Sequence, residues 1–176
     1  AIGGNHFLHA ARRNMDLTAI VVNNSIYGMT GGQYSPTTPL DQRATTAPYG
    51  NIEPPVPICD LAKAAGASYV ARGTVFHAVE LDRYFEQAIQ KNGFSIVEAV
   101  SYCHTTYGRI NKLGTAVDMM RTIKDNSITM AASEKMTPEE RAGKIIRGVL
   151  CDIERPGYVD LYDQLIQRVQ ETSHAQ

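Results

Sequence analysis

Two asparagines that follow an apolar run are the clearest chemical signal in this sequence. Residues 17–22 are mostly apolar and partly β-branched, which predicts a strand buried on both faces, and Asn23 and Asn24 end it. Ligands of parallel α/β sheets bind beyond the carboxyl ends of the strands. The side-chain oxygen of Asn24 and the backbone carbonyl of Ile26 are hard, neutral donors, which Mg²⁺ commonly shares with phosphate oxygens. These residues could therefore hold Mg²⁺ and a phosphate group, but an Asn pair after a strand is more often ordinary turn chemistry, and spacing alone favours the turn.

A glycine-rich loop continues from this strand end. Gly28, Gly31 and Gly32 would let backbone N–H groups approach a phosphate, because glycine carries no Cβ. Several more glycines and prolines leave little room for regular structure over residues 25–57. A loop of that length inside a compact domain is usually functional or disordered. Its mixed composition favours an ordered loop that handles a ligand.

Cys103 is the second candidate for chemistry. It follows a predicted strand and precedes His104, although a lone cysteine is usually a small buried hydrophobic residue. With Cys59 and Cys151 it makes three cysteines without CxxC spacing, so this chain cannot supply a four-cysteine cluster site alone. These thiols indicate a reducing compartment or a metal site completed elsewhere. His6, near the proposed phosphate end, could also reach a ligand.

The elements that position these residues alternate between helix and strand. Apolar residues at helical spacing predict helices at 4–14, 57–66, 81–91, 113–123 and 158–169. The predicted strands are 17–22, 68–71, 94–100 and an edge strand at 145–153. This alternation indicates βαβ crossovers, and thus an α/β fold with a parallel sheet and helices on both faces.

Composition narrows the class of protein. The 176 residues are 43% hydrophobic and 20% charged with a net charge of −1, which fits one globular domain and excludes a disordered chain. Neither a nucleic-acid-binding cationic face nor a transmembrane stretch of about 18 apolar residues is expected. Because the sequence opens at Ala1 without an initiator Met or a signal peptide, we expect a fragment that is incomplete at its N-terminus.

Several of these motifs together resemble one family, the β subunits of 2-oxoacid:ferredoxin oxidoreductases, and within it the 2-oxoglutarate branch. The matching stretches are 2–7, 12–14, 21–24, 27–33, 35–39, 64–72, 108–109, 111–113 and 154–156. They cover most of the chain, and the most specific stretch runs from Asn23 to Gln33.

The resemblance implies a thiamine diphosphate-binding fold in which this chain holds the diphosphate end of the cofactor through Mg²⁺. Asn24 matches the asparagine that ligates the metal, and Ile26 matches the residue that offers its carbonyl. Gly28 and Met29 match positions that touch the diphosphate. The family's Gly-Asp-Gly half of the motif, which carries the carboxylate ligand, would lie before Ala1.

The resemblance also gives Cys103 a role as the fourth ligand of a [4Fe–4S] cluster. The family's other three ligands are cysteines of the N-terminal part of the subunit, which this sequence does not contain. The flanks of Cys103 read Tyr102 and His104, which departs from the family's usual Pro-Cys-Pro or Pro-Cys-Val.

The implied activity is oxidative decarboxylation of a 2-oxoacid, with CoA converted to acyl-CoA and electrons passed through the cluster to ferredoxin. The glutamate that activates the cofactor lies on the family's α subunit, so no catalytic residue is assigned in this chain. An α subunit and ferredoxin are the expected partners, and the cytoplasm is the expected location. Residues 1–124 are expected to form the C-terminal part of the cofactor-binding domain, and residues 125–176 an extension that packs on it or on the partner.

Three alternatives remain open at this level. The chain could belong to a thiamine diphosphate-dependent decarboxylase or synthase that uses no cluster. It could be a pyruvate or branched-chain variant of the same family. It could also be a non-catalytic α/β module that has kept the scaffold and lost the site.

Overall fold

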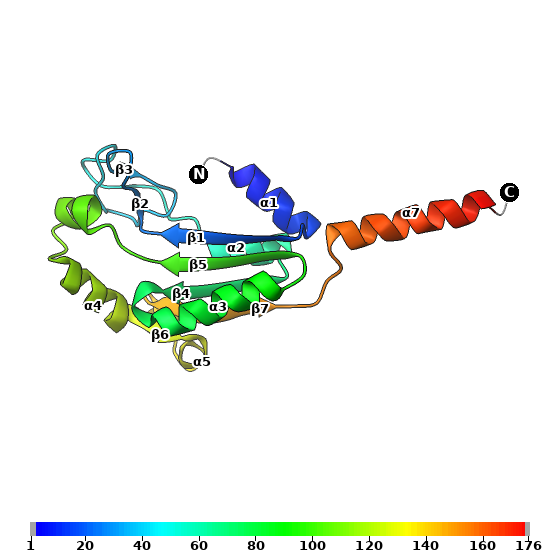
Figure 1. The fold of residues 1–176 in the computed structure, drawn as a ribbon. Helices are drawn as coiled ribbons and strands as arrows, with labels where there is room; N and C mark the ends of the chain where they lie inside the picture. Colours follow the sequence, from blue (N-terminus) through cyan, green and yellow to red (C-terminus); the bar gives the residue numbers. More distant parts are fainter. Residues whose placement is uncertain (1–2, 175–176) are drawn as a thin grey trace.

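One mixed sheet organises the computed structural model, which describes residues 3–174 (Figure 1). Its five strands are β1 (Leu17–Asn23), β5 (Phe94–Val100), β4 (Tyr69–Thr74), β7 (Ile145–Asp152) and β6 (Ser127–Thr129), in that spatial order. The first three strands run parallel, as predicted, while β7 runs antiparallel to β4. The expected start of a fragment at Ala1 lies outside the described residues.

Helices cover both faces of the parallel strands, which confirms the predicted α/β architecture. On one face, α1 (Gly4–Arg13) and α2 (Ile58–Ala65) enclose a core that includes Ala62, Val70 and Ile96. On the other face, α3 (Ala78–Gln90) covers a core that includes Val97 and Ala99. Both cores are small and apolar, so their burial provides the main force that holds helices to sheet.

Two predictions about individual strands are wrong. The strand β1 is not buried on both faces, because it forms an edge of the sheet and leaves Ile20 49% and Val22 65% exposed. The predicted edge strand at 145–153 lies instead between β4 and β6. A run of apolar residues identifies a strand by its local pattern, but it does not identify the neighbours on either side.

The remaining elements are short, apart from the last helix. The loop after β1 contains the hairpin β2 (Ile26–Tyr27) and β3 (Gln33–Tyr34), and further helices are α4 (Ala116–Asn126), α5 (Met130–Ser133) and α6 (Pro138–Arg141). The final helix, α7 (Tyr158–His174), extends away from the sheet (Figure 1). Its apolar residues are about half exposed, among them Leu161, Leu165 and Val169. No helix within residues 3–174 is both long and apolar enough to cross a membrane.

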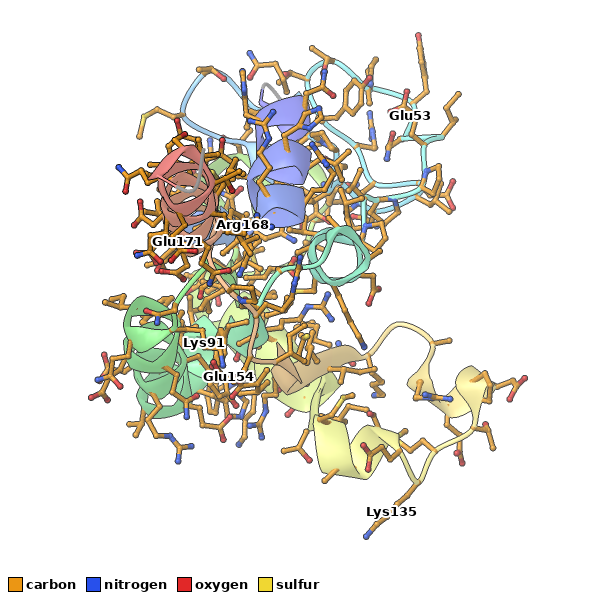
Figure 2. All side chains as sticks on the ribbon, turned by 90° about the vertical axis from the view of Figure 1, so that its right-hand side faces the viewer. Glu53, Lys91, Lys135, Glu154, Arg168 and Glu171 are labelled. Atoms are coloured by element: carbon orange, nitrogen blue, oxygen red, sulfur yellow. The ribbon has the colours of Figure 1, made fainter. Side chains whose placement is uncertain are left out.

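The side chain of Asn14 joins the start of α7 to the sheet. Its Oδ1 accepts hydrogen bonds from Ser68 Oγ and from the Phe94 N–H, both at 2.8 Å, and its Nδ2 donates to the Pro156 carbonyl at 3.0 Å. Nearby, Lys91 forms an ion pair with Asp152 at 2.8 Å and another with Glu154. Figure 2 shows Lys91 beside Glu154 below the end of α7. These contacts fix the chain where it leaves β7.

Replacing Asn14 by alanine should destabilise the protein, because it leaves the buried Phe94 N–H and Ser68 Oγ without their acceptor. We expect a loss of about 3 kcal/mol in the free energy of unfolding, measured by urea denaturation. The exposed Asn92, changed to alanine as a control, should alter stability by less than about 0.5 kcal/mol. Equal stabilities of the two variants would contradict this role for Asn14.

Candidate functional site

The parallel pairing of β1 and β5 brings the two predicted site segments to one edge of the sheet. Asn23 lies opposite Val100, and the Ser101 N–H donates a hydrogen bond to the Asn23 carbonyl at 2.8 Å. The two chains therefore leave the sheet side by side. Asn24 begins one of the segments and Cys103 lies in the other, although 79 positions separate them in the sequence.

A tight turn follows β1. Ser25 adopts a left-handed conformation with φ 63°, which few residues other than glycine adopt. Its N–H donates to Asn23 Oδ1 at 3.1 Å, and the Ile26 N–H donates to Asn24 Oδ1 at 3.3 Å. The Ser25 carbonyl accepts from Thr38 Oγ1 at 2.6 Å. The expected turn chemistry is thus present, and the Asn24 oxygen keeps a second lone pair for a metal ion.

A cavity of about 550 Å³ opens beside this turn. Its walls come from the start of α1, the end of β1, β2, the loop and α2. The lining residues are Gly3, Gly4, Asn5, Phe7, Leu8, Val21, Val22, Asn23, Asn24, Ile26, Tyr27, Ser35, Pro36, Thr37, Val56, Ile58 and Leu61. The first turn of α1 contains no acidic residue, and the unpaired N–H groups of a helix start favour an anion. The lining is otherwise mainly apolar, so Asn24, Ile26 and the start of α1 form the part of this cavity where a phosphate group and a metal ion would bind.

The predicted diphosphate residues Gly28 and Met29 lie outside this lining, in the next turn. Met29 is 99% exposed. The N–H groups of Gly31 and Gly32 are already used, since they donate to the carbonyls of Gly28 and Tyr27 at 3.4 and 3.0 Å. By contrast, the N–H groups of Gly28 and Met29 have no acceptor among the described residues. Among the N–H groups of Gly28, Met29, Gly31 and Gly32, only those of Gly28 and Met29 are therefore free to bind a phosphate.

The glycines also have a packing role that sequence reasoning missed. A Cβ added at Gly28 would lie 3.1 Å from Cys103 Sγ, and one added at Gly32 would lie 2.2 Å from Thr106 Cγ2. The turn that contains both glycines therefore packs directly on the segment that begins at Cys103. This close approach places the candidate thiol against the candidate diphosphate turn.

Cys103 is half-buried at the start of a π-helix, His104–Gly108. Burial alone would raise the pKa of its thiol, but hydrogen bonds from the Thr105 hydroxyl and the N–H groups of Tyr107 and Thr106 outweigh it and lower the pKa. The thiolate is the form that binds iron, so this environment suits a metal ligand. The neighbouring His104 is exposed.

A buried carboxylate beneath the turn was not predicted. Glu98 on β5 is 4% exposed, and it accepts hydrogen bonds from Arg72 Nε and Asn23 Nδ2, both at 2.7 Å, and from Cys59 Sγ at 3.2 Å. Burial opposes ionisation of Glu98, yet the Arg72 guanidinium lowers its pKa on balance. The pKa of the Cys59 thiol is raised, first by burial and then by Glu98, so Cys59 is an unreactive thiol. The sequence feature that could have identified Glu98 is that it is the single charged residue within the apolar run 94–100.

The described residues could hold parts of two metal sites. No group of three or more His, Cys, Asp or Glu side chains within residues 3–174 is arranged to bind a metal ion. What they offer is two oxygens, from Asn24 and Ile26, and one thiol, from Cys103. His6 is exposed on α1 and does not line the cavity, so the structure does not bring it into the candidate site.

Comparison with known proteins supports the predicted resemblance. Residues 1–99 match the family model described as the thiamine pyrophosphate enzyme, C-terminal TPP binding domain. The chain is 52% identical over 96% of its length to the 2-oxoglutarate synthase subunit KorB of Methanocaldococcus jannaschii, and 49% identical over 98% to that of Methanothermobacter marburgensis. It spans 63% and 60% of the lengths of these two relatives.

A solved structure is also similar to this chain. It is a 2-oxoglutarate:ferredoxin oxidoreductase from Magnetococcus marinus, with 2-oxoglutarate, coenzyme A and succinyl-CoA bound. The TM-score is 0.81 at 27% sequence identity, and the match covers 97% of this chain and 58% of that one. Together these matches confirm the predicted resemblance and the predicted fold class.

Proposed function

We propose a function from one premise: this chain belongs to the family of thiamine pyrophosphate enzymes and carries their C-terminal TPP-binding domain. It acts within the β subunit of a 2-oxoglutarate:ferredoxin oxidoreductase. The reaction converts 2-oxoglutarate and CoA to succinyl-CoA and CO₂, releases one proton, and transfers two electrons singly to two oxidised ferredoxins. The observation that carries this proposal is the near-full-length similarity of the chain to two subunits named KorB.

In this proposal the chain binds the diphosphate end of thiamine diphosphate. Asn24 Oδ1 and the Ile26 carbonyl would supply hard oxygens to Mg²⁺, and the N–H groups of Gly28 and Met29, which lie in the turn beyond the cavity lining, would donate to phosphate oxygens. The cofactor, when bound, serves as the electron sink for decarboxylation.

Cys103 would be one of four thiolate ligands of a [4Fe–4S] cluster, shared with cysteines outside this sequence. Its contact with Gly28 supports the role, because electrons must pass from the cofactor to the cluster over a short distance. The lowered pKa of its thiol agrees with ligation.

We also propose that residues 1–124 form the cofactor-binding part, and that residues 125–176 form an extension that packs on it or on the partner subunit. Two features support this division. The strands β7 and β6 join the sheet beside β4, so this part of the extension contacts the cofactor-binding part, whereas the apolar residues of α7 stay half exposed, as a partner-facing helix would leave them. The cytoplasm, where ferredoxin would accept the electrons, is the proposed location.

The activity can be tested on the complete protein, purified without oxygen together with its partner subunit. It should reduce ferredoxin only when 2-oxoglutarate and CoA are both present. Pyruvate and 2-oxoisovalerate lack the second carboxylate, so their kcat/KM should be at least about tenfold lower. Equal kcat/KM with pyruvate would assign the chain to the pyruvate branch, and CO₂ release without ferredoxin reduction would favour a non-redox enzyme.

Replacing Asn24 by leucine should abolish Mg²⁺-dependent binding of thiamine diphosphate, because an alkyl group replaces a hard-oxygen ligand. Binding can be measured by calorimetric titration of the cofactor-free complex with and without Mg²⁺. The same substitution at the exposed Asn92 serves as the control and should leave binding unchanged. Unaltered cofactor affinity in the Asn24→Leu variant would refute the metal assignment.

Replacing Cys103 by alanine should remove or destabilise the cluster while thiamine diphosphate still binds, because a missing thiolate leaves one iron without its protein ligand. Iron content and the EPR signal of the reduced protein measure this loss. Cys151, half-buried on β7, offers a matched control, and its alanine variant should keep the full iron content. If the protein is instead a thiamine enzyme without a cluster, the wild type and both alanine variants should contain no iron.

A further inference from the structure

We propose that Asn23 and Glu98 form a positioning pair that holds the Asn24–Ile26 turn in its metal-binding conformation from inside the sheet. The inference rests on the proposed function, because it takes Asn24 and Ile26 as ligands of Mg²⁺. Neither Asn23 nor Glu98 is itself proposed to touch the metal ion.

The anchor of the pair is Glu98, whose two carboxylate oxygens are both engaged. Oε2 accepts from Arg72 Nε at 2.7 Å and from Cys59 Sγ at 3.2 Å, while Oε1 accepts from Asn23 Nδ2 at 2.7 Å. Arg72 lies directly opposite Glu98 in the pairing of β4 with β5. The carboxylate is therefore fixed by strand register, by an ion pair and by a thiol from α2.

This anchor determines the orientation of the Asn23 amide. A carboxylate accepts hydrogen bonds and donates none, so the NH₂ of Asn23 must point to Glu98 and its oxygen must point the other way. That oxygen, Oδ1, accepts the Ser25 N–H at 3.1 Å. Asn23 thus connects a buried charge in the sheet to the backbone of the turn.

The turn needs such support because of Ser25. Its φ of 63° is a left-handed conformation that costs free energy for a residue other than glycine. The hydrogen bond to Asn23 and the one from Thr38 to the Ser25 carbonyl hold it there. In this conformation the Asn24 side chain and the Ile26 residue both line the same cavity.

A role in folding alone does not account for the arrangement. A buried ion pair such as Arg72–Glu98 contributes little net stability, because the desolvation of both charges offsets their attraction. Groups that orient metal ligands, in contrast, commonly change metal affinity by about 10- to 100-fold when they are removed. The Asn23→Ala substitution leaves the Arg72–Glu98 ion pair in place, so its effect on Mg²⁺ binding can be measured in a folded protein.

The first test uses the complete enzyme with its partner subunit, freed of cofactor, and measures the Mg²⁺ concentration for half-maximal thiamine diphosphate binding. In Asn23→Ala this concentration should rise by about tenfold or more. The control is Thr18→Ala, which removes one hydrogen bond, to the Ala88 carbonyl at 3.1 Å, at the opposite end of β1. The control should bind Mg²⁺ as the wild type does, and both variants should be folded at the assay temperature, as circular dichroism would check.

A second variant separates the two halves of the pair. Asn23→Ser keeps a short side-chain acceptor for the Ser25 N–H but cannot reach Glu98. The proposal expects it to remain impaired, and full recovery of wild-type Mg²⁺ dependence would remove Glu98 from the inference. Glu98→Gln should raise the Mg²⁺ requirement without adding to the effect of Asn23→Ala in the double variant. If Glu98→Gln fails to fold, the Mg²⁺ dependence of Asn23→Ala and Asn23→Ser decides whether the positioning pair is supported.

The outcomes also distinguish this inference from the function on which it rests. Wild-type binding that depends on Mg²⁺ and is lost in Asn24→Leu supports the proposed site. If Asn23→Ala then binds as the wild type does, the positioning pair alone is overturned. If the wild type itself shows no Mg²⁺-dependent cofactor binding, the proposed function fails and the pair fails with it.

Discussion

The parallel register between β1 and β5 is the constraint on which the rest of the site depends. Side chains alternate between the faces of a strand, so a slip of one residue would move Asn23 to the opposite face, away from Glu98. The same register sends the segments of Asn24 and Cys103 out of the sheet together. Backbone pairing between two apolar strands thus determines where both groups of polar atoms lie.

The parts that could be predicted from the sequence depend on local patterns. The spacing of apolar residues in α2, with Gly66 in a left-handed conformation at its end, is readable without knowledge of the neighbours. The same holds for the apolar run that ends at Asn23. Because ligands gather at the carboxyl ends of parallel strands, the position of the cavity beside Asn24 followed from these local features.

The rest could not be predicted, because it depends on contacts between distant segments. The pairing of Arg72 with Glu98 requires that β4 and β5 be adjacent, and nothing near either residue identifies its partner. The exposed edge at β1 and the antiparallel direction of β7 likewise concern the order of strands. The glycines were assigned to a phosphate, whereas Gly32 is also required by the close approach of Thr106 from a segment far along the chain.

The contact between Gly28 and Cys103 has a consequence for how this protein can vary in evolution. A side chain at position 28 requires the sulfur to move by a few tenths of an ångström, which a free thiol in a folded chain allows at little cost. In the proposed role as a cluster ligand, the sulfur of Cys103 would be held by the geometry of the cluster and could not yield in this way. If Cys103 ligates the proposed cluster, selection for electron transfer would keep position 28 as glycine. A lineage without the cluster would be released from that restriction at positions 28 and 103 together.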